Sequence, residues 1–389
     1  MLRWAAAVTT PVRVVLASHR YPPATGGSER WAELLATGLA RRGISMTVVT
    51  SLEPGASASE ERDGVQVLRL PLRPFLAWRR PVGYLALLRS LNADVFHLSG
   101  NRIWCVDYYL PHSRSFSWAQ VMTGHGFYQF AMHPRFWDRW YFRRYLPRRL
   151  QGIDAYAALT EFERMQLLSW GVEPARLVTI PQGLDVGEFG TPPPSVEQVR
   201  AQWSLSAPNV AVYAGGFFEN KRVDRLVRVV ARTAGRWALV AMGPDVPGSP
   251  YGRGAVTSLA RTLGAELRVV DIVPRADVVA ALFAADVAVL GSEYEGFGYF
   301  LLEAMAAGRP FVAFPSGAAP ELAASGGGIV AGSEEAFAAA LGSLEDPATR
   351  AGMGARGRAS IGAWSADRMV DRYVALYERL LRSRRGPTG

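Results

Sequence analysis

Lys221 is the residue whose type and position most directly suggest chemistry. It is the single lysine among 43 lysine and arginine residues, and it follows Gly215-Gly216 after the apolar run 209–214. A lysine ammonium is a compact point charge, whereas the planar arginine guanidinium suits bidentate pairing. Because a strand followed by a glycine turn and a cation commonly holds phosphate, we expect Lys221 to face a departing phosphate group. Chance survival of one lysine is the alternative.

Two glutamates flank a second turn between a strand and a helix. Glu295 follows the apolar strand 286–290, and Glu303 falls about one turn inside the next helix. Gly296 and Gly298 let the backbone approach a ligand, and the free N–H groups of the helix start then point at an anion. Carboxylates placed in this way accept hydrogen bonds from sugar hydroxyls while the amides hold phosphate. On these residues alone, an ordinary strand-turn-helix with an acidic N-terminus remains the alternative.

The composition favours a soluble enzyme with an anionic partner. The chain has 389 residues, 49% hydrophobic and 20% charged, a length that favours two domains. No apolar run approaches the roughly 20 residues of a membrane span, so we expect a cytoplasmic protein. The formal charge of +9 favours a nucleotide, an acidic lipid surface or a nucleic acid as partner. The single cysteine, Cys105, excludes an internal disulfide and is expected to be buried.

Segment 127–149 interleaves aromatic residues with six arginines. On a helix starting near Arg135, positions 136, 140 and 143/144 share one side, so aromatic and basic groups are not cleanly separated. One interpretation is a helix packed on the core with a solvated basic edge. The other is contact with an anionic membrane face or a lipid-linked substrate.

The order of apolar runs predicts two α/β domains, each with a doubly wound parallel sheet. Strands are expected at 12–17, 46–50, 65–70, 94–98, 119–123, 155–159, 177–180, 209–214, 237–242, 267–270, 286–290 and 310–314. Helices are expected at 28–42, 223–233, 255–263, 276–284 and 299–307. The segment 191–195 is typical of a linker, and segments 53–64 and 243–254 of surface loops. Ligands of such sheets bind beyond the carboxyl ends of the strands, with the cleft between the domains as the natural place.

Several motifs, in order along nearly the whole chain, resemble the retaining GT-B glycosyltransferases, particularly glycosyltransferase family 4. Glu295 to Glu303 matches the E-x7-E pattern of that family. The other matching segments are Tyr21-Pro22-Pro23 with Gly26-Gly27-Ser28-Glu29, Thr123-Gly124-His125-Gly126, Thr160-Glu161-Phe162, Ile180-Pro181-Gln182-Gly183-Leu184-Asp185 through Phe189, Gly243-Pro244-Asp245, and Trp364 with the helix that follows it.

The resemblance implies a role for each matching residue. Lys221 would neutralise the diphosphate, Glu295 would bind sugar hydroxyls, and His125 would contact the sugar near its anomeric carbon. These three form the implied catalytic set. The implied donor-binding set comprises Glu303 for the ribose hydroxyls, backbone at Gly26, Gly27, Gly216, Gly296, Phe297, Gly298 and Tyr299 for phosphate, Arg222, and Ile272 near the base.

Two positions depart from the family pattern. Many members carry arginine where this chain has Gly216, so a second phosphate cation is missing or moved to Arg222. Members also often carry proline where this chain has Phe300. The second phosphate contact and the donor preference are therefore open.

We interpret the chain as a retaining, metal-independent glycosyltransferase that moves a sugar of the hexose type from a nucleotide sugar to a glycan, lipid-linked or small-molecule acceptor. No Asp-x-Asp pair and no His/Cys grouping at ligand spacing is present, so neither a metal nor a cofactor is implied. Residues 1–188 would bind the acceptor, residues 189–364 would bind the donor, and helix 365–389 would pack on the first domain. A peripheral contact with the inner membrane face is one of the two interpretations of segment 127–149, and no contact with nucleic acid is expected. The alternatives are a GT-B nucleotide-sugar epimerase, a phosphorylase-like enzyme and a noncatalytic nucleotide-sugar-binding protein.

Overall fold

A computed structural model describes residues 11–75, 78–101, 103–127, 136, 140–271 and 274–385. The chain divides into two compact units. Unit 1 contains the residues up to Gly183 and those from Ala366 onward, and unit 2 is Leu184–Ser365. The proline-rich segment 191–195 lies inside unit 2, so it does not separate the units as a linker would.

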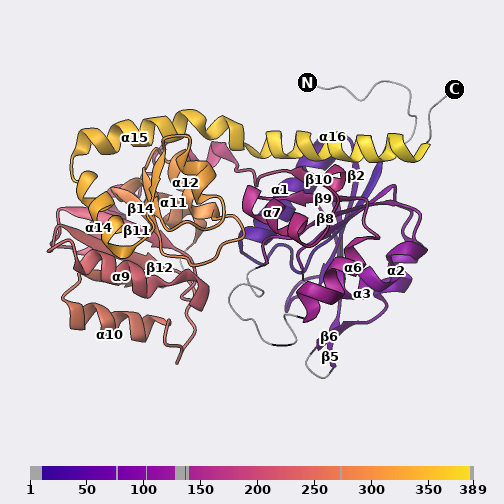
Figure 1. The fold of residues 1–389 in the computed structure, drawn as a ribbon, viewed down its shortest axis with the longest axis horizontal. Coiled ribbons are helices and arrows are strands. Elements are labelled where there is room, and N and C mark those ends of the chain that lie inside the picture. Colours follow the sequence, from indigo (N-terminus) through magenta and orange to yellow (C-terminus); the bar gives the residue numbers. More distant parts are fainter. Residues whose placement is uncertain are drawn as a thin grey trace. The chain divides into compact units, whose positions relative to one another are not determined.

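Unit 1 is built on an eight-stranded sheet in the order β10-β9-β8-β7-β1-β2-β4-β3 (Figure 1). Every neighbouring pair is parallel except β3 with β4. The strands are β1 (Arg13–Ala17), β2 (Ser45–Ser51), β3 (Ser59–Arg62), β4 (Val65–Leu70), β7 (Val95–Ser99), β8 (Ala119–Thr123), β9 (Ala155–Ala158) and β10 (Leu177–Thr179). The helical segments are α1 (Gly27–Arg41), α2 (Tyr84–Ser90), α3 (Trp104–Tyr109), η1 (Leu110–Ser115), η2 (Tyr141–Tyr145), α6 (Leu146–Leu150), α7 (Glu161–Ser169), η3 (Pro174–Arg176) and α16 (Ala366–Arg385).

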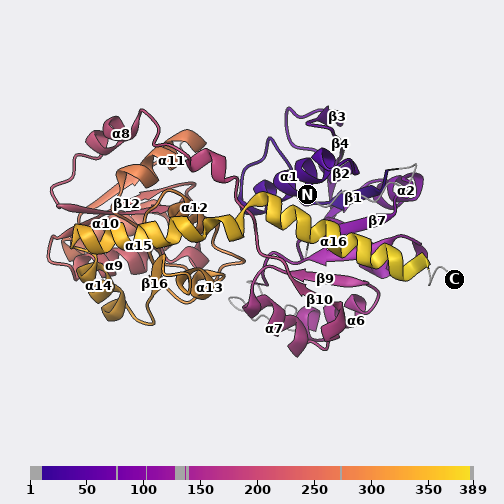
Figure 2. The ribbon, with the colours of Figure 1, turned by 90° about the horizontal axis from the view of Figure 1, so that it is seen from above.

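The last helix, α16, belongs to unit 1 although it is separated in sequence from the rest of that unit. Figure 2 shows α16 lying over the sheet of unit 1, where it packs on α1 and β8. Its buried face carries Met369, Val370, Tyr373, Leu376 and Tyr377. This apolar stripe repeats at the spacing of one helix face, which explains why the helix docks on a sheet.

Unit 2 is a six-stranded parallel sheet in the order β13-β12-β11-β14-β15-β16. Figure 1 shows α9 and α10 on one side of the sheet and α11 and α12 on the other, as in a doubly wound fold. The strands are β11 (Asn209–Ala214), β12 (Trp237–Met242), β13 (Leu267–Val270), β14 (Val287–Leu290), β15 (Phe311–Ala313) and β16 (Gly328–Val330). The helical segments are η4 (Val186–Phe189), α8 (Val196–Trp203), η5 (Glu219–Lys221), α9 (Val223–Ala231), α10 (Arg253–Leu263), α11 (Arg275–Ala284), α12 (Tyr299–Ala306), α13 (Ala319–Ala323), α14 (Glu334–Ser343), α15 (Pro347–Ser360) and η6 (Ile361–Trp364).

The predicted α/β class with two doubly wound sheets is confirmed, but three short β elements were not predicted. Segment 53–64 is not a simple loop, because Ser59–Arg62 forms β3 along the edge of the sheet. Its side chains are polar and mostly exposed, so no apolar alternation marks it. The hairpin of β5 (Leu72–Phe75) with β6 (Trp78–Pro81) and the three-residue strand β16 were missed as well.

The described part of the basic aromatic segment favours one of its two interpretations. Residues 128–135 and 137–139 lie outside the described residues, but 141–150 is helical, with a π-helical turn at Tyr141–Tyr145. Tyr141, Phe142, Leu146 and Leu150 are buried, whereas Arg143, Arg144, Arg148 and Arg149 are exposed. The described part is therefore a core-packed helix with a solvated basic edge. The expected grouping of positions 136, 140 and 143/144 agrees with this division, since all four side chains are exposed.

Candidate active site

The lysine turn, residues 215–222, places Lys221 beside Glu295. The Lys221 ammonium lies 2.6 Å and 2.8 Å from the two carboxylate oxygens of Glu295. The Ser292 hydroxyl donates to the same carboxylate over 2.6 Å. Glu295 is buried, and the Lys221 side chain keeps 24% of its surface exposed. The structure therefore brings together two of the three residues of the implied catalytic set.

These two residues meet because their strands are neighbours. β11 leads into the lysine turn, and β14 leads into the glutamate turn, residues 291–298; the two strands pair in parallel through Ala211 and Val287. Chain order reverses at this pair of strands, so the turns at their carboxyl ends share the usual ligand position of a doubly wound sheet. Gly291 permits the close approach, since a Cβ there would lie 2.6 Å from the Arg222 carbonyl oxygen.

Gly298 and Gly317 shape the start of α12. Gly298 precedes the helix with a φ of 94°, a conformation that glycine adopts without steric cost. Gly317 also has a positive φ, and a Cβ there would lie 2.7 Å from the Glu295 Cβ. The Phe297 carbonyl accepts the Ala318 N–H at 2.7 Å, which fixes the glutamate turn against the loop after β15. Gly296 and Tyr299 are partly exposed in this turn.

Glu303 lies in the second turn of α12 and is buried. Its carboxylate lies 2.6 Å from the Arg275 guanidinium at the start of α11. Arg275 also pairs with Glu188 at 3.0 Å and lies over the Phe189 ring. A carboxylate that is already oriented by a partly exposed arginine is suited to exchanging that partner for hydroxyl donors.

Arg222 and Gly216 differ from the expected phosphate contacts. The Arg222 guanidinium binds Asp224 at 2.9 Å and 3.0 Å and Glu293 at 3.0 Å, and these acids raise its pKa. At Gly216 a Cβ would lie 2.1 Å from the Phe218 ring, so that ring occupies the space of the missing side chain. The structure therefore gives Arg222 three acidic contacts in place of an open phosphate contact.

The histidine turn, residues 124–126, follows β8 in unit 1. His125 has a φ of 57°, in the left-handed region, and its ring is partly exposed. Its Nε2 lies 3.0 Å from the Ser99 hydroxyl at the end of β7, and its ring packs edge-on against Trp31 at 4.5 Å. Burial lowers the pKa of His125 to about 3, so the imidazole is neutral at physiological pH.

In the glycine-rich loop at the start of α1, the Glu29 carboxylate occupies the space beside Gly26. Gly26 precedes the helix, and a Cβ there would lie 2.3 Å from the Glu29 carboxylate. Ser28 donates to the same carboxylate at 2.8 Å. A negative group therefore already lies at the N-terminus of α1, where Gly27 is the first residue. Ile272 lies outside the described residues.

Two family models match this chain. Residues 25–188 match "Glycosyltransferase Family 4", and residues 208–346 match "Glycosyl transferases group 1". The D-inositol 3-phosphate glycosyltransferase of Kineococcus radiotolerans is 30% identical over 94% of this chain and 93% of its own length. The chain belongs to the GT-B glycosyltransferases. It therefore transfers a sugar from a nucleotide-sugar donor.

Further similar proteins agree with the family and the fold of this glycosyltransferase. The GDP-mannose-dependent alpha-(1-6)-phosphatidylinositol monomannoside mannosyltransferase of Mycolicibacterium smegmatis is 27% identical over 89% of this chain and 92% of its own length. Sucrose-phosphate synthase from Thermosynechococcus elongatus has a similar structure, with a TM-score of 0.80, 22% identity, and coverage of 96% of this chain and 100% of its own. Anabaena Alr3699/HepE, in its complex with UDP and glucose, has a TM-score of 0.78 and 18% identity to this chain. The match covers 95% of this chain and 100% of Alr3699/HepE.

Sequence reasoning missed the residues that support the histidine turn of this glycosyltransferase. Glu163 is 1% exposed and accepts the Gly126 N–H at 3.2 Å. Asn101 donates to the carbonyls of Gly124 and Gly126. Thr160 and Glu163 have the spacing of a capping box, a sequence signal that could have drawn attention to Glu163. Nothing local indicates Asn101, which is distant in sequence from the turn.

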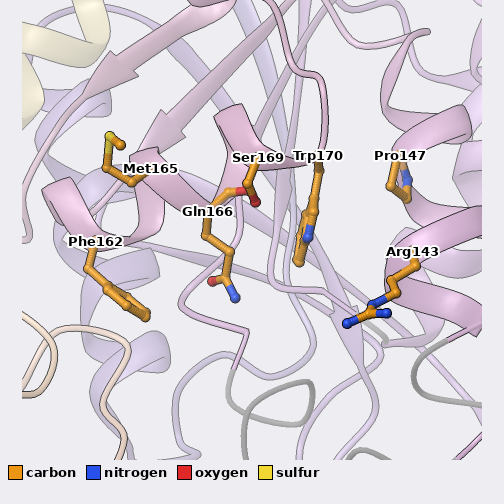
Figure 3. Close-up of a pocket in the computed structure, with 7 residues that line it drawn as sticks. All are labelled: Arg143, Pro147, Phe162, Met165, Gln166, Ser169 and Trp170. Carbon is orange, nitrogen blue, oxygen red and sulfur yellow. The ribbon is translucent and has the colours of Figure 1, made fainter.

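A groove of about 580 Å³ runs along α7 (Figure 3). Its lining is mainly apolar or aromatic, with one guanidinium, and comprises Arg143, Pro147, Phe162, Met165, Gln166, Ser169 and Trp170. Phe162 and Met165 are each 56% exposed, which is unusual for side chains of this size. The Trp170 ring packs edge-on at 4.7 Å from Phe127, the residue after the histidine turn. The α7 groove therefore adjoins that turn.

The described residues contain neither a metal-binding cluster nor a membrane-spanning helix. Within the described ranges, no group of three or more His, Cys, Asp or Glu side chains is arranged to hold a metal ion. Among the helices that the structure describes, none is long and apolar enough to cross a membrane. Cys105 is buried, as expected.

Proposed function

We propose that this glycosyltransferase is a metal-independent, retaining enzyme of family 4 that transfers a hexose. The contact between Lys221 and Glu295 at the carboxyl ends of β11 and β14 carries the proposal. It provides a point positive charge and a sugar-binding carboxylate within one hydrogen bond of each other. In this proposal, unit 2 binds the donor and unit 1 binds the acceptor.

The main requirement of the reaction is stabilisation of the negative charge that develops on the leaving group. Lys221 and the N–H groups at the start of α12 would stabilise the diphosphate as the glycosidic bond breaks. Glu303 would bind the ribose hydroxyls, and Glu295 the sugar hydroxyls after exchanging part of its contact with Lys221. His125, which is neutral, would contact the sugar near the anomeric carbon. A metal is unnecessary in this scheme because the ammonium and the helix end supply the positive charge.

Retention would follow from attack on the face from which the leaving group departs. A phosphate oxygen of the leaving diphosphate would take the acceptor proton, so the new bond would keep the anomeric configuration. Glu295 contacts Lys221 and Ser292, an arrangement suited to binding a sugar rather than to acting as a free nucleophile.

The acceptor would carry a phosphate or a lipid phosphate. One similar protein is a D-inositol 3-phosphate glycosyltransferase and another acts on a phosphatidylinositol monomannoside, according to their names. Both kinds of acceptor are anionic, in keeping with the net charge of +9. We propose that the α7 groove, with Arg143 at its rim, contacts the lipid side of such an acceptor and with it an anionic membrane surface.

Incubation with nucleotide sugars tests the proposed function. The purified protein is mixed with UDP-glucose or GDP-mannose, with and without D-inositol 3-phosphate, and the products are followed by mass spectrometry and NMR. We expect nucleoside diphosphate release and an anomeric configuration like that of the donor, both unchanged in excess EDTA. An inverted product would contradict retention, loss of turnover in EDTA restored by Mg²⁺ would contradict metal independence, and an epimerised donor would favour the epimerase alternative. Binding without turnover of any donor tried would favour the noncatalytic alternative.

Vesicle sedimentation tests the membrane contact separately. Binding to vesicles of acidic phospholipid should fall as salt rises, because exposed charges are screened within about 8–10 Å at physiological ionic strength. A double change, Arg143→Gln with Arg144→Gln, should weaken binding. The matched change Arg236→Gln, an exposed arginine of unit 2, should not. Equal binding to neutral and acidic vesicles, or to neither, would contradict the contact.

A further inference from the structure

Glu163 connects two segments that follow neighbouring strands. One carboxylate oxygen accepts the Gly126 N–H at 3.2 Å, and the other accepts the Leu159 N–H at 2.7 Å. Gly126 lies beyond β8 and Leu159 beyond β9, and these strands pair in parallel. The side chain comes from the first turn of α7, whose N-cap Thr160 accepts the Glu163 N–H at 3.1 Å. The carboxylate therefore fastens the histidine turn to the start of this helix.

The histidine turn needs such support because its backbone is unfavourable. A non-glycine residue in the left-handed region persists only where its surroundings hold it. At Gly124 a Cβ would lie 2.6 Å from the Glu163 carboxylate and 2.8 Å from the Phe127 ring, so the turn packs tightly against both. Asn101 binds the carbonyls of the turn, and Glu163 binds an N–H of it. The conformation of His125 is thus fixed from outside the turn.

Moving the turn would move the imidazole. The His125 ring makes one polar contact of 3.0 Å with Ser99 and a longer one of 3.5 Å with Gln182. Its edge-on packing against Trp31 defines the plane of the ring. A shift of the Gly126 backbone would change all three contacts, because His125 is the residue next to it.

We propose that Glu163 is a positioning residue for the transfer reaction: by accepting the N–H groups of Gly126 and Leu159 together, its carboxylate holds His125 where the sugar must meet it. This proposal rests on the role of His125 in the proposed function. Glu163 itself touches no substrate, since it is buried behind the turn.

The ionised carboxylate accepts both N–H groups strongly, whereas protonation makes one of its oxygens a weak acceptor. Burial raises the pKa of Glu163 to about 7, from an ordinary value of 4.5, although both backbone contacts oppose this rise. Tyr373 interacts with the Glu163 charge, and burial raises its pKa further above the ordinary value, so it stays uncharged. His125, in the turn that Glu163 supports, is neutral because burial lowers its pKa to about 3. His97, one strand away, is also neutral, with a pKa of about 3. The charge on Glu163 therefore changes near neutral pH while its neighbours do not.

Activity and stability should respond to this titration in opposite directions. Because the folded pKa is raised, the folded protein binds the proton more tightly, and this stabilisation is present below pH 4.5 and lost as pH rises through about 7. The two accepted hydrogen bonds, in contrast, are strongest with the ionised form. Turnover should therefore fall as pH drops through about 7, while the free energy of unfolding rises.

The test is a pH profile of turnover for Glu163→Gln beside the wild type, with the nucleotide sugar that the wild type consumes. Glutamine accepts one N–H and presents its own NH2 to the other, so we expect kcat to fall roughly ten- to hundredfold. KM for the donor should change little. The acid limb near pH 7 should be present in the wild type and absent from the variant. Glu161→Gln, an exposed change on the same helix, should keep the wild-type profile.

Several outcomes would overturn the proposal. A folded Glu163→Gln protein with wild-type kcat, or with an unchanged acid limb, would show that Glu163 has no role in positioning. If the variant does not fold, the test is made on the wild type. Its infrared difference spectra must show a buried carboxyl group that titrates with the midpoint of the acid limb. Spectra without such a carboxyl group overturn the proposal. A wild type that consumes no nucleotide sugar would instead be a failure of the proposed function.

Discussion

The lysine turn of unit 2 and the histidine turn of unit 1 each follow a parallel strand, β11 and β8, but are held by different forces. Lys221 is held by the opposite charge of Glu295, and the next residue, Arg222, by two more carboxylates. His125 is neutral, and the backbone of its turn is supported by the Asn101 side chain, which donates to it, and by the Glu163 carboxylate, which accepts from it. Ion pairs can exchange one partner for a charged ligand, whereas a hydrogen-bonded backbone keeps its shape. The first arrangement suits binding of a diphosphate, and the second suits orientation of a fixed ring.

This difference also determines what a substitution should do in each region. Removing one member of a buried or half-buried ion pair leaves the other without its partner, which costs more than the pair contributes. Removing a support of the histidine turn removes a hydrogen bond to its backbone and alters the geometry of the turn. Substitutions in the lysine turn of unit 2 should therefore change the electrostatic stabilisation of the substrate. Substitutions around the histidine turn of unit 1 should instead change the position of the imidazole.

Lys221 should show the largest effect. Lys221→Ala should lower turnover on the order of 10²–10³-fold, the usual loss for one preorganised electrostatic contact. Lys221→Arg should still lower it at least about tenfold, because a planar fork in the lysine turn misplaces the charge relative to the breaking bond. Steady-state kinetics check both, with Arg236→Lys as the control for an exposed arginine paired with Glu345. Wild-type turnover in Lys221→Arg would show that charge alone suffices.

Glu303 should affect donor binding more than rate. Glu303→Ala removes charge-assisted hydrogen bonds to the donor, and the loss of one such bond, worth roughly 1.5–3 kcal/mol, should by itself lower donor affinity about ten- to 150-fold. Arg275 keeps Glu188 as a partner, which limits structural damage from the change. Calorimetric titration with the donor is the measurement, and Glu345→Ala is the control. Unchanged affinity in the folded variant would remove Glu303 from the donor site.

Removing a helix N-cap should give the smallest effect. Because each unit contains such a cap, the same change can be compared between the two units. Thr160→Ala in α7 and Ser333→Ala in α14 each remove one N-cap contact, at 3.1 Å and 3.2 Å, and should each cost about 1 kcal/mol in unfolding free energy. Urea unfolding measures this loss. Turnover should fall only in Thr160→Ala, because that cap orients Glu163. Equal turnover in the two variants would show that the N-cap of α7 does not affect the histidine turn.

The predicted elements follow from periodicity, and the missed ones show where periodicity fails. Apolar runs such as 237–242 are buried on both sides, so their sequence alone indicates a central parallel strand. Ser59–Arg62 is an exposed edge strand whose polar residues resemble a loop. The π-helical turn at Tyr141–Tyr145 shifts the phase of the helix, which no regular spacing predicts. Segments without a buried apolar face, and segments that depart from regular helical geometry, are therefore not recognised from the spacing of apolar residues.

The order of most strands and helices, the two turns rich in glycine, and the residue types available for binding a nucleotide sugar could all be predicted from the sequence. These are local properties of the chain, set by the spacing of apolar residues and by the freedom of glycine. Which of these residues meet depends on the tertiary fold. Lys221 finds Glu295 because β11 and β14 are neighbours, and Glu163 reaches Gly126 because β8 lies beside β9. Strand order is a property of the whole sheet, and the partner of each buried charge depends on it.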